Sequence, residues 1–271
     1  MPSGKRARQA RRQVPPPPVR GAGGTRAQRQ LSRRTLAIAG AVAALVVIGV
    51  VVAVVASGGN GKTQASTLPT SGSVVNGLPG AADVHAKFNG IPQNGLVLGS
   101  PSAPVTMVEY IDLQCPFCRE FETQVWPGLV ATYVRTGKVK VQAQVLAFIG
   151  PDSLRGRDAM IAASFQNHAF DFAQLLYDNQ QTENTGWLND AIVAKAAQSI
   201  PGVNPRQLVQ SASTSRVQAI AARIDAEATA KGVHQTPTLF VGKSGAPGKL
   251  VPMASPTDGA SVVAAIKAAL A

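Results

Sequence analysis

The stretch Tyr110–Phe121, YIDLQCPFCREF, decides the fold of this chain. It contains the chain's two cysteines, Cys115 and Cys118, with a Pro-Phe dipeptide between them. The run that leads into it, Pro104–Ile111 (PVTMVEYI), is rich in β-branched and aromatic residues, and this composition predicts a strand. The two cysteines therefore come directly after a predicted strand.

An apolar repeat follows the cysteines and predicts a helix. Large apolar side chains recur every four residues, at Phe117, Phe121, Val125, Leu129 and Tyr133. The charged residues that fall on the other faces of this helix are Arg119, Glu120 and Glu122. Pro116 suits the first turn, where its missing N–H costs nothing, whereas Pro127 falls inside the pattern and is expected to kink or break the helix.

The next segment completes a β-α-β unit. Gly137 is expected to end the helix, and Lys138–Leu146 (KVKVQAQVL) alternates between apolar and polar residues as a half-buried strand does. Two strands joined through a helix are expected to lie parallel, with a right-handed crossover.

The rest of the chain predicts a block of helices and then a short β-β-α segment. Helix-period stretches occur at Asp158–Tyr177, Leu188–Ser199 and Pro205–Lys231. The later elements are two short strands and a terminal helix, at Thr238–Val241, Lys249–Val251 and Ser261–Ala271. The fold class is therefore α/β, with a helical insertion at about residues 152–231.

The spacing of the cysteines predicts redox chemistry. Two cysteines three apart at the start of a helix have Cα atoms about 5–6 Å apart, which a disulfide accepts. The unpaired N–H groups and partial positive charge of a helix N-terminus lower the pKa of the first thiol. Cys115 is therefore the predicted nucleophile, and Cys118, one turn deeper, the buried resolving cysteine. The same electrostatics stabilise the thiolate form and make the disulfide more oxidising.

Two plainer explanations of the cysteine pair are weaker. A structural disulfide across so short a loop removes little conformational entropy from the unfolded chain. A zinc site lacks ligands, because His85, His168 and His234 lie far apart in the sequence and no third cysteine exists. We therefore expect a redox-active pair and no metal site.

Two motifs resemble a known family. Tyr110–Phe121 and a second motif, Gly232–Val241 (GVHQTPTLFV), with helical stretches between them, resemble the DsbA-like thiol-disulfide oxidoreductases of the thioredoxin superfamily. The resemblance covers about Leu96–Ala271, and it is strongest to the membrane-anchored members of Gram-positive and actinobacterial envelopes. It implies a thioredoxin fold interrupted by an inserted helical domain.

The resemblance also implies roles for single residues. Cys115 would be the attacking cysteine and Cys118 the resolving one. Pro237 would be the cis-proline, and Thr236 before it would pair its backbone with substrate. Glu109, the lone charged residue of its apolar run, matches a buried acid that could take the proton from Cys118 during disulfide exchange. An ordinary carboxylate at the end of a strand is the alternative interpretation of Glu109.

The dipeptide between the cysteines departs from the family pattern. Strongly oxidising relatives have a polar or basic residue where this chain has Phe117. Phenylalanine cannot hydrogen-bond a thiolate, which favours a less oxidising disulfide, but with Pro116 it offers apolar surface to unfolded substrates. An envelope disulfide reductase of the same fold and a non-catalytic thioredoxin-like binding module therefore remain alternatives to an oxidase.

Basic residues are concentrated at the N-terminus. The formal net charge is +12 at pH 7, but ten of the 26 Lys and Arg residues lie in Met1–Arg34, which has no acidic residue. The remainder has 16 basic against 14 acidic residues, which argues against nucleic-acid binding. Residues 1–34 are predicted to be a disordered cytoplasmic tail. Apolar residues make up 45% of the chain, so the rest is able to bury a core.

Thr35–Ala56 is predicted to be a single transmembrane helix. From Leu36 on it has 21 consecutive small or apolar residues, and as a helix such a run spans about 32 Å, the thickness of a bilayer's hydrocarbon core. The preceding arginines place the N-terminus in the cytoplasm. Residues 57–80, rich in Gly, Ser and Thr, predict a flexible linker to an extracytoplasmic domain at 81–271. A cleaved signal peptide and a twin-arginine export signal at Ser32–Leu36 are alternatives.

The resemblance implies protein partners and no cofactor. The substrates would be unfolded exported proteins, and a membrane quinone-linked oxidase of the DsbB or VKOR-like kind would reoxidise the cysteines. The sequence has no phosphate loop or dinucleotide fingerprint, so no nucleotide or flavin is expected.

Overall fold

The structure is a computed structural model that describes residues 65–271. The predicted basic tail (1–34), the predicted transmembrane helix (35–56) and the first part of the predicted linker (57–64) lie outside the described residues. Within residues 65–271, no helix combines the length and the apolar composition that crossing a membrane requires.

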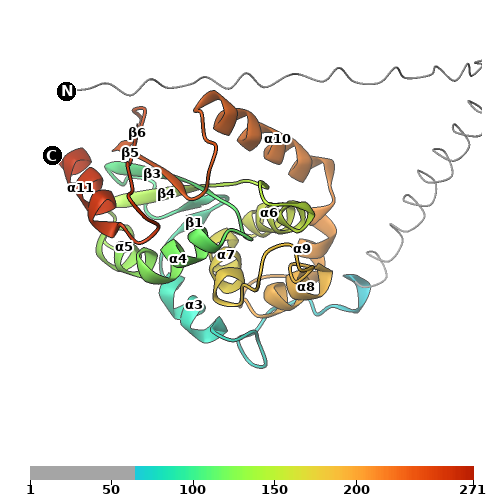
Figure 1. The fold of residues 1–271 in the computed structure, drawn as a ribbon. Helices are drawn as coiled ribbons and strands as arrows, with labels where there is room; N and C mark the ends of the chain where they lie inside the picture. Colours follow the sequence, from blue (N-terminus) through green and yellow to red (C-terminus); the bar gives the residue numbers. More distant parts are fainter. Residues whose placement is uncertain (1–64) are drawn as a thin grey trace, which may run out of the picture. The chain divides into compact units, whose positions relative to one another are not determined.

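Among the described residues, a mixed six-stranded sheet forms the centre of the fold (Figure 1). Its strands in chain order are β1 (Gln93–Asn94), β2 (Val97–Leu98), β3 (Val105–Ile111), β4 (Val139–Val145), β5 (Thr238–Lys243) and β6 (Lys249–Leu250). Their order in space is β1-β2-β4-β3-β5-β6, with β3 parallel to β4 and antiparallel to β5. The predicted strands and their parallel pairing are confirmed, and the β1–β2 hairpin, which no sequence pattern predicts, extends the sheet.

Helices cover both faces of the sheet. They are α3 (Ala81–Phe88), α4 (Pro116–Gln124), α5 (Trp126–Leu129), the π-helical turn η1 (Val130–Val134), α6 (Pro151–Ser164), α7 (Ala169–Asp178), α8 (Asp190–Gln198), α9 (Pro205–Ala212), α10 (Ser215–Ala230) and α11 (Gly259–Leu270). Helix α10 lies over one face, whereas α4, α5 and α11 lie on the other (Figure 1).

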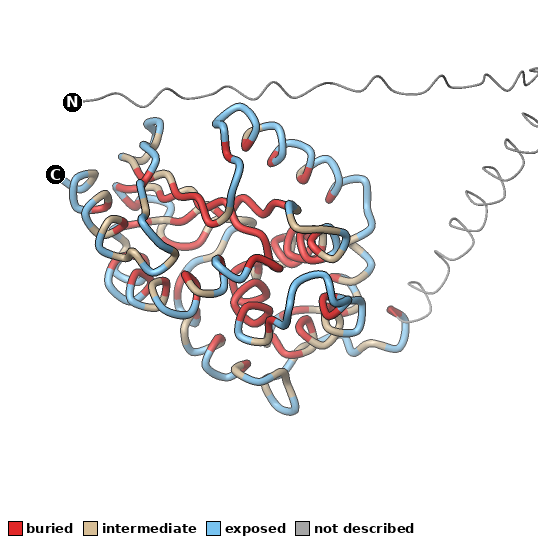
Figure 2. Tube along the Cα trace, in the orientation of Figure 1, coloured by how far each residue is buried: buried red, intermediate tan, exposed pale blue. Residues whose placement is uncertain are grey.

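The sheet meets the helical block at the carboxyl ends of its two long parallel strands. In both β3 and β4 the first residues alternate between buried and half-buried, but the last three residues are all buried. Figure 2 shows buried chain in these strands and also in α6 and α7. The segment that follows β3 and contains the cysteines therefore starts in the interior of the fold.

Three predicted helical stretches are divided in the structure. The helix after the cysteines ends before Val125, so the interruption expected at Pro127 comes two residues earlier. The stretch 158–177 falls into α6 and α7, because Asn167 between them has a left-handed φ of 61°. The stretch 205–231 falls into α9 and α10, with a break at residues 213–214.

Residues 65–80, within the predicted flexible linker, lie against the helical block. The N–H of Gly72 donates to the Val203 carbonyl oxygen at 2.8 Å, and Gly72 forms a parallel bridge with Pro201. A Cβ atom on Gly72 would lie 2.1 Å from the carbonyl oxygen of Ile200, so only glycine permits this approach. The prediction of a flexible linker is therefore wrong for this part, because backbone hydrogen bonds hold it in place.

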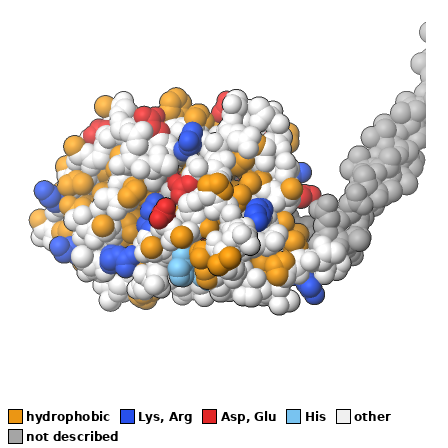
Figure 3. Space-filling model, turned by 90° about the horizontal axis from the view of Figure 1, so that it is seen from below, with side chains coloured by type: hydrophobic (Ala, Val, Ile, Leu, Met, Phe, Trp, Pro, Cys, Tyr) orange, Lys and Arg blue, Asp and Glu red, His pale blue; other side chains and the backbone are white. Residues whose placement is uncertain are grey.

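Charges of both signs are scattered over the face that Figure 3 shows, among apolar and neutral polar groups. This distribution agrees with the near balance of acidic and basic residues after the N-terminal tail. The face offers no extended surface of one sign, which nucleic-acid binding would require.

Candidate active site

Cys115 immediately precedes α4, and Pro116 takes the first helical position. Proline suits that position because its φ is already helical and its missing N–H would have no partner there. Cys118 lies in the first turn of the helix. Both cysteines are buried, Cys118 completely, and neither is in a disulfide.

A segment 121 residues later in the chain lies against Cys115. The Cys115 thiol donates a hydrogen bond to the carbonyl oxygen of Thr236 at 3.3 Å, and the Thr236–Pro237 peptide bond is cis. The two motifs meet because β5, which starts after Pro237, pairs with β3, which ends before Cys115. The structure thus brings the predicted residues Cys115, Cys118, Thr236 and Pro237 together.

An apolar hollow borders the cysteines. Phe117 is 57% exposed and lines this hollow of about 390 Å³ together with Thr236, Pro237 and the segment 250–256. Pro116 beside it is also exposed. A hollow of this kind beside a reactive sulfur has room for an apolar side chain of a bound peptide.

The environment of Cys115 favours its thiolate. A hydrogen bond from the Cys118 thiol is the main cause that lowers the pKa of Cys115, from 9.0 to about 6. A side-chain hydrogen bond from Thr236 and the backbone N–H groups of Cys118 and Phe117 lower this pKa further, whereas burial opposes them. The two N–H groups belong to the first turn of α4, where they have no helical partner.

Cys118 has the opposite electrostatic environment. Complete burial raises the pKa of Cys118 well above 9.0, and its hydrogen bond to Cys115 raises it further. At neutral pH Cys115 is therefore the thiolate and Cys118 the thiol. This division is what a nucleophile and its resolving partner require.

Glu109 is buried within β3, as its place in an apolar run predicts. Its side chain is 1% exposed, and its Oε1 atom has no hydrogen-bond partner. Burial raises the pKa of Glu109 from 4.5 to about 7, and a hydrogen bond with Glu122 opposes this shift. Glu109 is therefore able to gain or lose a proton near neutral pH.

Glu122 is the buried partner of Glu109, although the apolar repeat assigns it, with Arg119 and Glu120, to the other faces of the helix. It is 5% exposed, and burial followed by the charge of Glu109 raises its pKa well above 4.5. The charge of Lys87 of α3 lowers the pKa of Glu122 and opposes these two causes. Glu122 lies four residues after Cys118, and this helical spacing could have revealed that the two share a buried face.

Two further buried polar residues, Asp112 and Gln114, lie in the turn between β3 and α4. The sequence analysis does not single them out. Their position could have identified them, because polar residues between a buried strand and a buried cysteine need hydrogen-bond partners. Among residues 65–271, no group of three or more His, Cys, Asp or Glu side chains is arranged to hold a metal ion.

Sequence comparison places this geometry among known proteins. The thioredoxin family matches residues 92–250 of the chain. The chain is 27% identical over 147 residues to the probable disulfide bond formation protein D of Bacillus cereus, covering 53% of this chain and 68% of that protein. It is 25% identical over 153 residues to disulfide bond formation protein D of Bacillus subtilis, covering 54% of this chain and 66% of that protein.

Solved structures have the same fold. Oxidised BdbD from Bacillus subtilis superposes with a TM-score of 0.58 at 22% identity, over 66% of this chain and 97% of that one. A thioredoxin-like oxidoreductase from Silicibacter pomeroyi superposes with a TM-score of 0.51 at 27% identity, over 69% of this chain and 96% of that one. The range matched by the thioredoxin family, residues 92–250, includes the strand-turn-helix unit with the cysteines and the segment with the cis peptide bond.

Proposed function

The chain belongs to the thioredoxin family as a DsbA-like thiol-disulfide oxidoreductase, and on this basis we propose that it donates the Cys115–Cys118 disulfide to exported proteins outside the cytoplasm. The observation that carries the proposed direction is the contrast between the two thiols. A pKa of about 6 for Cys115 stabilises the reduced enzyme, so its disulfide gives up its oxidising equivalents readily.

The proposed reaction proceeds through a mixed disulfide. A substrate thiolate attacks the Cys115 sulfur, the bond to Cys118 breaks, and Cys118 leaves with the electron pair and takes up a proton. A second substrate thiolate then attacks the substrate sulfur of the mixed disulfide and releases Cys115 as a thiolate. Two electrons pass from the substrate to the cysteine pair, and the substrate gains one disulfide.

Glu109 is proposed to supply the proton that Cys118 needs. The pKa of Glu109, raised to about 7 by burial, lets it hold a proton at neutral pH and give it up at little cost. The pKa of Cys118 is raised well above 9.0, so its thiolate readily accepts that proton. In the reverse direction, Glu109 would take the same proton back.

The surface around Cys115 is proposed to bind an extended chain. Thr236 would pair its backbone with the substrate beside the sulfur, while Phe117, Pro116 and Pro237 would contact the neighbouring side chains. The hollow of about 390 Å³ next to these residues supports an apolar side chain at that point. Unfolded proteins expose such side chains, which fits a substrate class without a common sequence.

A trapping experiment tests this chemistry. With Cys118→Ala, the Cys115 thiolate is still able to attack a disulfide of an exported protein, which forms a mixed disulfide and releases the other sulfur of that protein as a thiolate. Cys118, the thiol that would break this mixed disulfide, is absent. We expect adducts with exported proteins to accumulate and to disappear on reduction. The Cys115→Ala, Cys118→Ala double variant is the matched control. If the single variant forms no more adducts than the control does, the chain is a non-catalytic binding module.

The reduction potential tests the direction of electron flow. Equilibration with glutathione is expected to give a value between about −120 and −180 mV, the range of DsbA and disulfide isomerase. A value near about −270 mV, that of thioredoxin, would make the protein a reductase. Phe117→His should move the potential toward the oxidising end, because histidine is able to donate a hydrogen bond to the thiolate.

We further propose that the protein is a single-pass membrane protein, with residues 1–34 in the cytoplasm and 81–271 outside it. The apolar run of residues 35–56 and the arginines before it support this placement. A membrane quinone-linked oxidase of the DsbB or VKOR-like kind would reoxidise the cysteines. Protease treatment of intact cells without their wall should cleave residues 81–271 of a membrane-bound chain. Recovery of a soluble chain that begins at about residue 57 would show instead that the segment before it is a cleaved signal peptide.

A further inference from the structure

The carboxylate of Asp112, directly after β3, has the most hydrogen bonds of the residues around the cysteines. Its Oδ1 atom accepts from the Gln114 N–H at 2.8 Å and from the Ser153 hydroxyl at 2.8 Å. Its Oδ2 atom accepts from the N–H groups of Phe148 and Ile149 at 2.8 and 3.2 Å. Four donors from three segments of the chain thus converge on one buried side chain, and this number of donors matches the acceptor capacity of an ionised carboxylate.

The backbone of the same residue supports Cys115. The Cys115 N–H donates to the Asp112 carbonyl oxygen at 3.0 Å, which closes the turn before α4, and the Tyr177 hydroxyl donates to the same oxygen at 3.1 Å. The side-chain amide of Gln180 donates to the carbonyl oxygens of Leu113 and Cys115 at 2.9 and 3.2 Å. The turn is therefore held by its own bonds and by groups in and just after α7.

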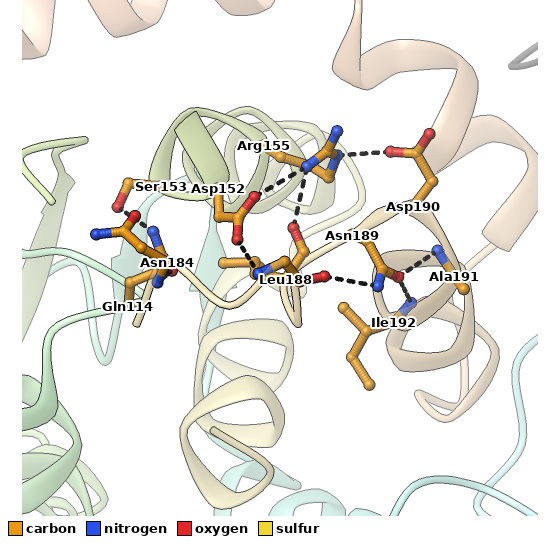
Figure 4. Close-up of polar contacts among 11 residues, drawn as sticks. Gln114, Asp152, Ser153, Arg155, Asn184, Leu188, Asn189, Asp190, Ala191 and Ile192 are labelled. Atoms are coloured by element: carbon orange, nitrogen blue, oxygen red, sulfur yellow. Dashed lines mark hydrogen bonds and ion pairs between the residues drawn. The ribbon is translucent and has the colours of Figure 1, made fainter. Parts of the chain in front are cut away.

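Gln114 extends this network into the helical block, as Figure 4 shows. Its amide nitrogen donates to the Ser153 hydroxyl at 3.0 Å, and its amide oxygen accepts from the Asn184 N–H at 2.9 Å. The Asn184 side chain donates to the Ile149 carbonyl oxygen at 3.2 Å. The segment after β4, the start of α6 and the loop after α7 are thus joined to one turn of four residues.

On the basis of the proposed function, we propose that Asp112 is a positioning residue for Cys115. Its carboxylate holds the turn so that the Cys115 sulfur lies at the N-terminus of α4 and against the Thr236 carbonyl oxygen. Asp112 acts through the backbone, because all four hydrogen bonds of its carboxylate go to groups other than the sulfur. In this way the helical block helps to set the reactivity of the nucleophile.

The sign of a mutational effect separates positioning from a direct charge effect. A nearby negative charge disfavours a thiolate, so its removal alone would lower the pKa of Cys115. Loss of positioning would instead raise that pKa, because the sulfur would move away from the groups that stabilise its anion. Asp112→Asn keeps the shape of the side chain but turns an NH₂ group toward two or more of the four donors.

The test is the rate of Cys115 alkylation by iodoacetamide against pH in the reduced protein, read by mass spectrometry. For Asp112→Asn we expect the pKa of Cys115 to rise by about one unit, which lowers its alkylation rate at about pH 5 roughly tenfold. Ser153→Ala, which removes one of the four donors, should shift the pKa in the same direction by a smaller amount. It also keeps the test decisive if Asp112→Asn does not fold.

Asp152→Asn is the matched control, since Asp152 lies in the same turn of α6 and its carboxylate accepts the N–H of Gly186 at 3.0 Å. It should lower the melting temperature without shifting the pKa of Cys115. A lowered melting temperature with an unchanged or lowered pKa in both Asp112→Asn and Ser153→Ala overturns the positioning role. A wild-type Cys115 that titrates like an ordinary thiol overturns the proposed function, and the inference with it.

Discussion

Two regions of the site respond to negative charge in opposite ways: the surroundings of the Cys115 sulfur, here called the upper region, and the buried side chains of Cys118, Glu109 and Glu122, here called the lower region. In the upper region, hydrogen bonds from Cys118, Thr236 and backbone N–H groups lower the pKa of Cys115 to about 6. In the lower region, burial raises the pKa of Cys118, Glu109 and Glu122. Both residues are cysteines, so burial and the available hydrogen-bond donors, and not the type of residue, decide which sulfur carries the charge.

The two regions have different roles in disulfide exchange. The upper region holds the charge of a leaving or attacking sulfur, while the lower region holds protons that have to move when the disulfide opens or closes. An enzyme of this kind needs both, because disulfide exchange requires a stable thiolate at one cysteine and a proton for the other cysteine when it leaves. Experiments that remove the difference in thiol reactivity between the two regions, or that alter a residue of one region, test this contrast.

The largest expected effect is on thiol reactivity. In the reduced protein at about pH 7, Cys115 should react with iodoacetamide on the order of 100-fold faster than Cys118, because only Cys115 is mostly thiolate. Mass spectrometry of the two peptides measures both rates. The same experiment in denaturant is the control and should bring the rates within a few-fold of each other. Similar rates in the folded protein would show that the two environments do not differ.

The next effect is on stability through Glu109. Its folded-state pKa is raised, so the stability linked to its protonated form is complete below about 4.5 and is lost as pH rises through about 7. Glu109→Gln, which stays neutral, should therefore be more stable than wild type at about pH 8, by on the order of 1–2 kcal/mol. Urea unfolding at about pH 4 and pH 8 measures this difference, which should be near zero at the lower pH.

Glu183→Gln serves as its control, because Glu183 is exposed on the loop after α7. It should change stability by less than about 0.5 kcal/mol at either pH. Glu109→Gln should also slow disulfide exchange, since the proton carrier for Cys118 is lost. A Glu109→Gln variant with unchanged stability at both pH values would mean that Glu109 is hydrated or ionised without penalty.

Cys115 should show the reverse pH dependence. Its folded-state pKa is lowered, so the stability linked to its thiolate is present above about 9 and is lost as pH falls through about 6. As pH rises between these values, the free energy of unfolding of the reduced wild type should therefore increase relative to that of Cys115→Ser, by on the order of 1–2 kcal/mol after allowance for solvent screening. Thermal or urea unfolding under reducing conditions measures it. A constant difference across this range would contradict a stabilised thiolate.

The smallest effect belongs to the exposed rim of the upper region. Phe117→Ala should change stability by less than about 0.5 kcal/mol, because its ring is mostly in solvent. It should raise the KM for a cysteine peptide with an apolar neighbour by about fivefold, as about 1 kcal/mol of apolar contact is lost. Leu154→Ala, an exposed apolar residue of α6 outside the hollow, is the control. An equal change in KM for both variants would remove the hollow from substrate binding.

Local patterns predicted the part of the fold around the cysteines. The apolar run before Cys115, the four-residue repeat after it and the alternation in β4 each specify one element, and the structure contains all three. The association of Cys115 with Thr236 and Pro237 came only from the family resemblance, because pairing of β3 with β5 across the helical block leaves no signal in either segment.

Features that depend on distant packing could not be predicted. Glu122 is polar and has charged neighbours in sequence, and its burial follows from the packing of α4 against α7, a distant part of the chain. Residues 65–80 have the composition of a flexible linker, yet the backbone of Gly72 is bonded to a turn after α8. Composition reports which residues are able to form a core, but not which backbone groups find partners.

The outermost strands of the sheet, β1 and β6, are only two residues long. A long open strand edge is a template on which any extended chain can add itself, and such addition leads to aggregation. A protein proposed to meet unfolded chains is especially exposed to this hazard. Because the edge strands are this short, an unfolded substrate cannot pair along them as an added strand. Its residence time is therefore set by the mixed disulfide with Cys115 and ends when that disulfide is broken.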